Sequence, residues 1–110
     1  MKYRELRAEM RATLTRRGAL IAGSHHIPCV VQDMSDNGLQ IMCTRPLIVG
    51  QTFQFRCELF PKRSLDCMIE VVHVGEAGIG TKIVEVDERG AKLIQLSLQE
   101  YFTAPVRRWE

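Results

Sequence analysis

The fold is decided around the stretch DMSDNGLQI, Asp33–Ile41, where a polar corner separates two apolar segments. Within it, Asn37-Gly38 is a strong short-range signal for a β-hairpin, because both residues tolerate the positive φ angles that a type I′ turn requires. The residues after the corner alternate between apolar and polar side chains, as in a strand that buries one face. The stretch therefore predicts two antiparallel strands joined by a tight turn.

Further segments on both sides of this hairpin are also typical of strands. Clusters of Gly, Pro, Ser and Asn separate them, which favours an antiparallel sheet or barrel over a helical fold. The expected strands are Ala19–Ala22, Pro28–Asp33, Gly38–Cys43, Thr52–Leu59, Leu65–Val74 and Ile79–Val86. In the fourth of them, alternation predicts four inward side chains: Phe53, Phe55, Cys57 and Leu59. Closing such a sheet into a barrel would remove its exposed edges.

The last part of the chain is expected to be helical. Asp87 can cap a helix that begins near Glu88, and Pro105 is expected to end it, because proline cannot continue a regular helix. Residues at helical spacing predict its apolar face: Ala91, Leu93, Ile94, Leu96, Leu98, Tyr101 and Phe102. The predicted fold class is therefore all-β with a terminal helix, a six-stranded antiparallel β-barrel on which the C-terminal α-helix packs.

Charge is unevenly distributed along the 110 residues, although the net charge is only +2. Met1–Arg17 holds six basic and two acidic residues, whereas the remainder holds nine basic and eleven acidic ones. Most of the basic residues are arginines, whose planar fork grips phosphate groups or guanine edges at two points. The basic segment therefore suggests an anionic partner, or else a solvated charged tail. Apolar spacing within Met1–Leu14 also allows a helix.

These patterns predict one domain in three parts: a basic N-terminal arm at residues 1–17, the barrel with its helix at residues 18–104, and a loose tail at residues 105–110. No apolar run is long enough to span a membrane, and the N-terminus is too charged for a signal peptide. We therefore expect a cytoplasmic protein without membrane insertion.

Catalytic and metal-binding classes find little support in the sequence. It has no Ser-His-Asp set, no metal-ligand cluster and no phosphate-cradling glycine loop, so we expect no enzyme, no metal and no cofactor. The cysteines show neither CxxC nor CxxH spacing, and we expect buried free thiols at Cys29, Cys43, Cys57 and Cys67.

Two short motifs occur in a meaningful order. Arg7 and Arg11 form an RxxxR, and Asp33, Ser35 and Gly38 form a DxSxxG. Each motif alone is weak. Together with the late strand run CMIEVVHVGEAGIGTKIVEV and the closing helix, they resemble the PilZ family of cyclic di-GMP receptors over nearly the whole chain. The resemblance implies a PilZ-type six-stranded barrel and the bacterial second messenger cyclic di-GMP as ligand.

The resemblance also implies roles for individual residues. Arg7 and Arg11 would contact guanine edges and phosphates, and would hold the N-terminal arm over the ligand. Asp33 would accept from the N–H donors of a guanine, because a carboxylate is acceptor-only at neutral pH. Ser35 would bond the same base or a phosphate, and Gly38 would allow close approach of the backbone.

A later strand of the family carries an aromatic or similar residue that stacks on a base, and His73 lies at about that place. Each assignment has a structural alternative. Arg7 and Arg11 could be solvated helix-face residues, Asp33 and Ser35 could stabilise their own turn, and His73 could be a rim histidine.

The function that this resemblance implies is a cyclic di-GMP-binding receptor or adaptor. It would order its arm on ligand binding and signal to an effector protein in motility, biofilm or exopolysaccharide control. One alternative is a PilZ-like adaptor that binds no nucleotide and docks on a partner such as a pilus motor protein. Another is a small basic barrel that binds nucleic acid, although we expect neither DNA nor RNA as partner.

Overall fold

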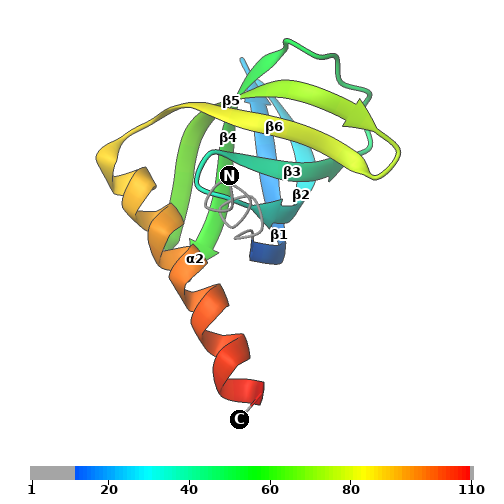
Figure 1. Ribbon diagram of the computed structural model, residues 1–110. Coiled ribbons are helices and arrows are strands. Elements are labelled where there is room, and N and C mark those ends of the chain that lie inside the picture. Colours follow the sequence, from blue (N-terminus) through cyan, green and yellow to red (C-terminus); the bar gives the residue numbers. More distant parts are fainter. Residues whose placement is uncertain (1–11, 110) are drawn as a thin grey trace, which may run out of the picture.

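The structure is a computed structural model that describes the backbone of residues 12–109 and the side chains of residues 14–100. It contains six strands and a helix (Figure 1). Their bounds are β1 (Ala12–Ala22), β2 (His25–Met34), β3 (Gly38–Cys43), β4 (Thr52–Phe60), β5 (Arg63–Gly75), β6 (Gly78–Val86) and α2 (Glu88–Trp109).

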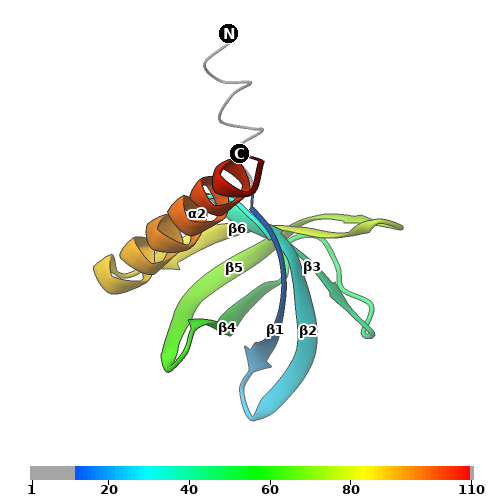
Figure 2. The same cartoon turned by 90° about the horizontal axis from the view of Figure 1, so that it is seen from below.

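The strands form a closed barrel in the order β1-β2-β3-β6-β5-β4, and all neighbours are antiparallel. Figures 1 and 2 show the strands curving around one another, with α2 outside them. Two pairings join strands that are not consecutive in the chain, β3 with β6 and β1 with β4. These two pairings close the barrel, and the expected fold class is confirmed.

One continuous hydrophobic core fills the barrel, and alternation along the strands supplies it. In β4 the four predicted inward side chains are all buried: Phe53, Phe55, Cys57 and Leu59. The residues between them are exposed, as the two-residue period of a strand requires. The core also contains Leu20, Val31, Met34, Ile41, Leu65, Ile69 and Val71.

The helix α2 begins where the sequence predicts. The backbone N–H of Gly90 donates to Asp87 Oδ1 at 2.7 Å, so Asp87 is the N-cap. Leu93, Ile94 and Leu98 are buried and join the barrel core, and the helix contacts β5 and β1. Its C-terminal half continues past the strands (Figure 1). No helix among the described residues is long and apolar enough to cross a membrane.

Three details of the helix differ from expectation. Pro105 does not end it, because α2 continues to Trp109 and includes most of the tail that was expected to be loose. Proline removes one backbone donor, and here the helical path continues through that position. Ala91 and Leu96 are exposed rather than buried, because the buried face of α2 is narrower than the spacing of its apolar residues.

The first strand begins earlier than expected, at Ala12 rather than Ala19. Four of the residues 12–17, which were assigned to the arm from their charge, pair with β2: Ala12, Thr13, Arg16 and Arg17. The helical alternative for Met1–Leu14 is thus wrong for its last three residues, and Met1–Arg11 lies outside the described residues. Alternation does not predict this part of the strand, because Thr15, Arg16 and Arg17 are polar in succession and all three are exposed.

The expected type I′ turn is wrong. Among the described residues, neither Asn37 nor Gly38 has a positive φ, and Gly38 is already the first residue of β3. Its role is packing: a Cβ built there would lie 2.2 Å from the backbone oxygen of Thr81 on β6. The next residue of β3 also contacts Thr81, because the Thr81 hydroxyl donates to the Leu39 carbonyl at 2.9 Å. Glycine is therefore needed at position 38 because β3 and β6 approach closely.

Burial determines the protonation state of three of the four cysteine thiols. All four are free thiols, with Cys29, Cys57 and Cys67 buried and Cys43 half-buried. Burial raises the pKa of Cys29 and of Cys67 to about 12 and the pKa of Cys57 to about 11, from an ordinary value of 9.0. These three thiols therefore stay protonated in the folded protein at neutral pH.

Gly38→Ala should destabilise the barrel, because its Cβ would overlap the Thr81 carbonyl of β6. Forcing atoms into a packed interior costs about 1–3 kcal/mol, which urea unfolding followed by circular dichroism would measure. Gly80→Ala is the matched control, because the nearest atom to a Cβ there is His73 Cβ at 3.4 Å. Equal stability of the two variants would contradict the packing role of Gly38.

Raising the pH above 9 should destabilise the protein through its buried thiols. Their folded-state pKa values of about 11 to 12 exceed the ordinary 9.0. Their contribution is therefore complete below pH 9 and is lost as the pH rises towards 11 to 12. We expect the Tm to fall over this interval, and to fall less in a Cys29→Ala, Cys57→Ala, Cys67→Ala triple variant than in Cys43→Ala. An equal fall in both would mean that other groups cause it.

Candidate functional site

The β2–β3 corner is a three-residue connection, Ser35–Asn37, fixed by hydrogen bonds. The Ser35 N–H donates to the Gly38 carbonyl at 2.9 Å, and the Asn37 N–H donates to Ser35 Oγ at 3.3 Å. The Ile83 N–H of β6 donates to the Asn37 carbonyl at 2.8 Å. Ser35 thus stabilises its own turn, as the structural alternative predicts, although a hydroxyl that accepts one bond can still donate another.

Asp33 is the first of four residues that lie in a row across the barrel. Cross-strand pairing sets Asp33 of β2 opposite Gln40 of β3, Gln40 opposite Gly80 of β6, and Gly80 opposite His73 of β5. Directly opposed residues project from the same face of a sheet. Their chain neighbours Met34, Leu39 and Thr81 are buried in the barrel, so the row lies on its outer face.

This polar row, defined as Asp33, Gln40, Gly80 and His73, forms a continuous surface beside the corner. Neighbouring strands are about 4.8 Å apart, so three steps put the backbone of His73 about 14 Å from that of Asp33. Gly80 adds no side chain between Gln40 and His73, and so leaves the middle of the row shallow. Asp33 and Gln40 are half-buried and His73 is exposed.

Two glutamines, Gln40 in the row and Gln32 next to Asp33, were not identified as site residues from the sequence. The Gln40 side-chain N–H donates to the Ala77 carbonyl at 3.5 Å. The Gln32 Oε1 atom is buried and has no hydrogen-bond partner within the part of the chain that the structure describes. A Cβ at Gly78 would lie 2.5 Å from Gln32 Oε1 and 3.0 Å from Gln40 Nε2, so both amides lie over this glycine. Both glutamines flank the DxSxxG motif in the sequence, but only the fold brings Gly78 to their amides, which explains why no local sequence pattern indicates their role.

The start of β1 lies beside Asp33. Ala12 pairs with Met34 and Thr13 pairs with Asp33. Arg7 and Arg11, the predicted ligand-binding arginines, lie outside the described residues. The described chain thus enters the barrel next to the DxSxxG corner, one residue after Arg11.

The first half of β1 contains an irregularity close to this entry point. The pairing register with β2 shifts between Thr13 and Arg16, and Thr15 has a φ of 99°. A positive φ is unfavourable for a β-branched residue. This strained bulge turns the strand immediately after the chain passes Asp33.

The structure thus places Asp33 and His73 on the outer face of the barrel, with Ser35 in the adjoining corner, and it places Gly38 elsewhere. Gly38 is buried and faces β6, so its direct role towards a ligand stays a prediction. Among the described residues, no group of three or more His, Cys, Asp and Glu side chains could hold a metal ion.

Comparisons with known proteins agree with this architecture. The structure is similar to that of the Bacillus subtilis inhibitor of motility MotI/DgrA, with a TM-score of 0.70 and 10% sequence identity. The similarity covers 84% of this chain and 50% of that protein, so the chain spans about half of its length. At this identity the likeness concerns the fold alone. No curated protein matches the sequence.

A family model settles the relationship at the level of sequence. The model of the PilZ domain matches residues 5–100. This range includes both short motifs, all six strands and most of the helix. The chain therefore belongs to the PilZ domain family.

Proposed function

We propose that this chain is a receptor module for cyclic di-GMP that passes the binding event to a partner protein. The observation that supports it most directly is the pairing of Thr13 with Asp33. Through it, the chain that carries Arg7 and Arg11 joins the barrel beside the DxSxxG corner. A ligand on the polar row would therefore be within reach of both motifs.

The residue types suit a guanine dinucleotide with two phosphates. An arginine fork matches the O6 and N7 acceptors of guanine and also pairs with phosphate. The Asp33 carboxylate complements the N–H donors of a guanine. Gln40 adds an amide that both donates and accepts, and His73 adds an exposed ring on which a base can stack. Gly80 leaves room for a flat ring between them.

The family supports a binding role. PilZ domains are binding and adaptor modules rather than enzymes, and we propose no catalytic activity for this chain. The structurally similar MotI/DgrA is named as an inhibitor of motility. We propose that the output of this module lies in bacterial motility, biofilm or exopolysaccharide control, through an effector protein, and that it acts in the cytoplasm.

A second candidate is an adaptor of the same fold that binds no nucleotide. The observation in its favour is that Ser35 and Gly38 both have structural roles, in the corner and against β6. The DxSxxG motif could thus be kept for folding alone. Titration calorimetry with cyclic di-GMP separates the two candidates, because the receptor releases or absorbs heat at micromolar ligand and the adaptor does not.

A nucleic-acid-binding barrel is the least favoured candidate. Such proteins stack bases on exposed aromatic rings. Phe53 and Phe55 are buried, and no Phe, Tyr or Trp side chain is exposed among residues 14–100.

Arg7→Ala and Arg11→Ala should each weaken cyclic di-GMP binding. A hydrogen bond to a charged group contributes about 1.5–3 kcal/mol, so we expect a loss of about tenfold to a hundredfold in calorimetric affinity. The Tm of the empty protein should stay nearly unchanged. Arg45→Ala is the control, because Arg45 is exposed on the connection between β3 and β4. Unfolding of either arm variant would show that these arginines are structural.

His73→Ala should weaken the same binding while leaving the fold intact. Stacking of a base on an aromatic side chain is worth about 1–3 kcal/mol, so the expected loss is about tenfold. Val74→Ala is the matched control on β5, since Val74 is 46% exposed and lies next to His73. Equal affinity of the two variants would remove His73 from the site and leave it as a rim residue.

A further inference from the structure

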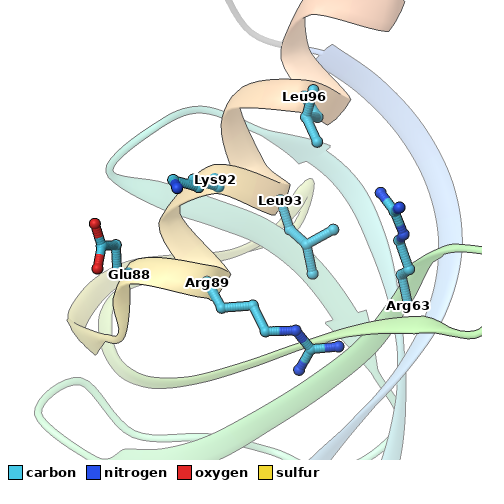
Figure 3. A pocket seen from close by; sticks show the side chains of 6 residues that line it. All are labelled: Arg63, Glu88, Arg89, Lys92, Leu93 and Leu96. Carbon is cyan, nitrogen blue, oxygen red and sulfur yellow. The ribbon is translucent and has the colours of Figure 1, made fainter.

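A hollow lies between α2 and the start of β5, away from the polar row. Its volume is about 470 Å³, and its walls are Arg63, Glu88, Arg89, Lys92, Leu93 and Leu96 (Figure 3). Arg63 opens β5, whereas His73 lies ten residues later on the same strand. At about 3.3 Å per residue, the hollow and the polar row are at opposite ends of a long strand.

Both walls of this hollow, which we call the basic groove, are firmly placed. Arg89, Lys92, Leu93 and Leu96 follow the spacing of a single helix face. The opposite wall follows the β4–β5 turn, in which Lys62 has a φ of 64° and its N–H donates to Glu58 Oε2 at 2.6 Å. The backbone on both sides of the groove is therefore held by the helix and by this turn.

The chemistry of the basic groove is that of a binding surface. Three of its six lining residues are cationic and one is anionic. Figure 3 shows the guanidinium groups of Arg63 and Arg89 flanking Leu93, with Glu88 and Lys92 projecting towards the other side of the helix. Neither arginine makes an ion pair with another described residue. The ion pair found among the described residues joins Arg56 to Asp66, outside the groove. Like charges that share a hollow repel each other, and an anionic occupant would relieve that repulsion.

The apolar residues narrow the class of occupant. Leu93 is 4% exposed and forms the floor, whereas Leu96 is 43% exposed at the rim. A free phosphate would leave Leu96 in water, and a nucleic acid would find no aromatic ring in this lining. The N-terminal segment of this chain is a poor occupant, because Met1–Arg17 holds six basic and two acidic residues.

The geometry points to the basic groove as a docking site for an acidic, amphipathic segment of a partner protein. Carboxylates of that segment pair with Arg63 and Arg89, and an apolar side chain covers Leu93 and Leu96. This assignment extends the proposed function by supplying an output surface, but it stands independently of cyclic di-GMP, because the groove and the polar row share no residue.

The test uses the full chain and three short synthetic peptides, each labelled with a fluorophore. One carries Glu and Leu at helical spacing, one replaces each Leu with Ser, and one replaces each Glu with Lys. Of the three peptides, only the Glu/Leu peptide should bind, as measured by fluorescence anisotropy. Its affinity should fall as salt is added. An Arg63→Glu, Arg89→Glu variant should lose at least about tenfold in affinity, while Arg45→Glu, outside the groove, should bind as the unchanged chain does.

Several outcomes would overturn the assignment. They are no binding of the Glu/Leu peptide, equal binding by the groove variant and the Arg45→Glu control, or binding of inorganic phosphate in its place. Self-association that the groove variant abolishes, measured by sedimentation, would instead assign the groove to a second copy of this chain. A calorimetric titration with cyclic di-GMP keeps the two proposals apart. The groove variant should bind the dinucleotide normally, and a chain that binds none can still pass the peptide test.

Discussion

The close approach of β3 to β6 at Gly38 and Thr81 is the contact on which the barrel and its outer surface both depend. A Cβ at position 38 would lie 2.2 Å from the Thr81 carbonyl oxygen, so a larger residue would force the two strands apart. The β3–β6 pairing joins the first half of the chain to the second and helps to close the barrel. It also aligns Gln40 with Gly80, and thereby connects Asp33 on one side of the polar row with His73 on the other. The glycine of the DxSxxG motif therefore contributes to the surface indirectly, by allowing the strands that carry it to meet.

The same arrangement divides the molecule into two regions with different chemistry. One is the polar row with its corner, where acceptor, amide and ring groups gather next to the entry of the chain into β1. The other is the basic groove, where α2 and β5 present arginines around an apolar floor. Strand β5 runs from one to the other, from Arg63 to Gly75, and most of its inward residues are in the core. The polar row and the basic groove therefore share no residue and lie towards opposite ends of β5.

Much of this could be predicted from the sequence, and the failures have physical causes. Strand centres and inward faces followed from alternation, as in β4, because a half-buried strand must alternate whatever its partners are. The hairpin was correctly located, but its turn type was wrong. Packing of Gly38 against β6 outweighed the local preference of Asn37-Gly38 for positive φ. The start of β1 was not predicted, because its residues are polar in succession. They pair with β2 through backbone hydrogen bonds, and the pattern of side chains does not indicate such bonds. Gln32 and Gln40 could not be assigned, because their amides meet at Gly78, which is far from both in the sequence. The roles of Arg7 and Arg11 stay predictions.

The pairing of β1 is uneven along its length. Residues Gly18–Ile21 are paired with both β2 and β4, whereas among the described strands the residues before Gly18 pair with β2 alone. The strained Thr15 falls within that singly paired part. Amide protons there are protected by one ladder, so they should exchange with solvent through small local openings, while those near Leu20 should require a larger opening of the barrel. The start of β1 is thus less extensively paired than its middle, although α2 contacts the same strand.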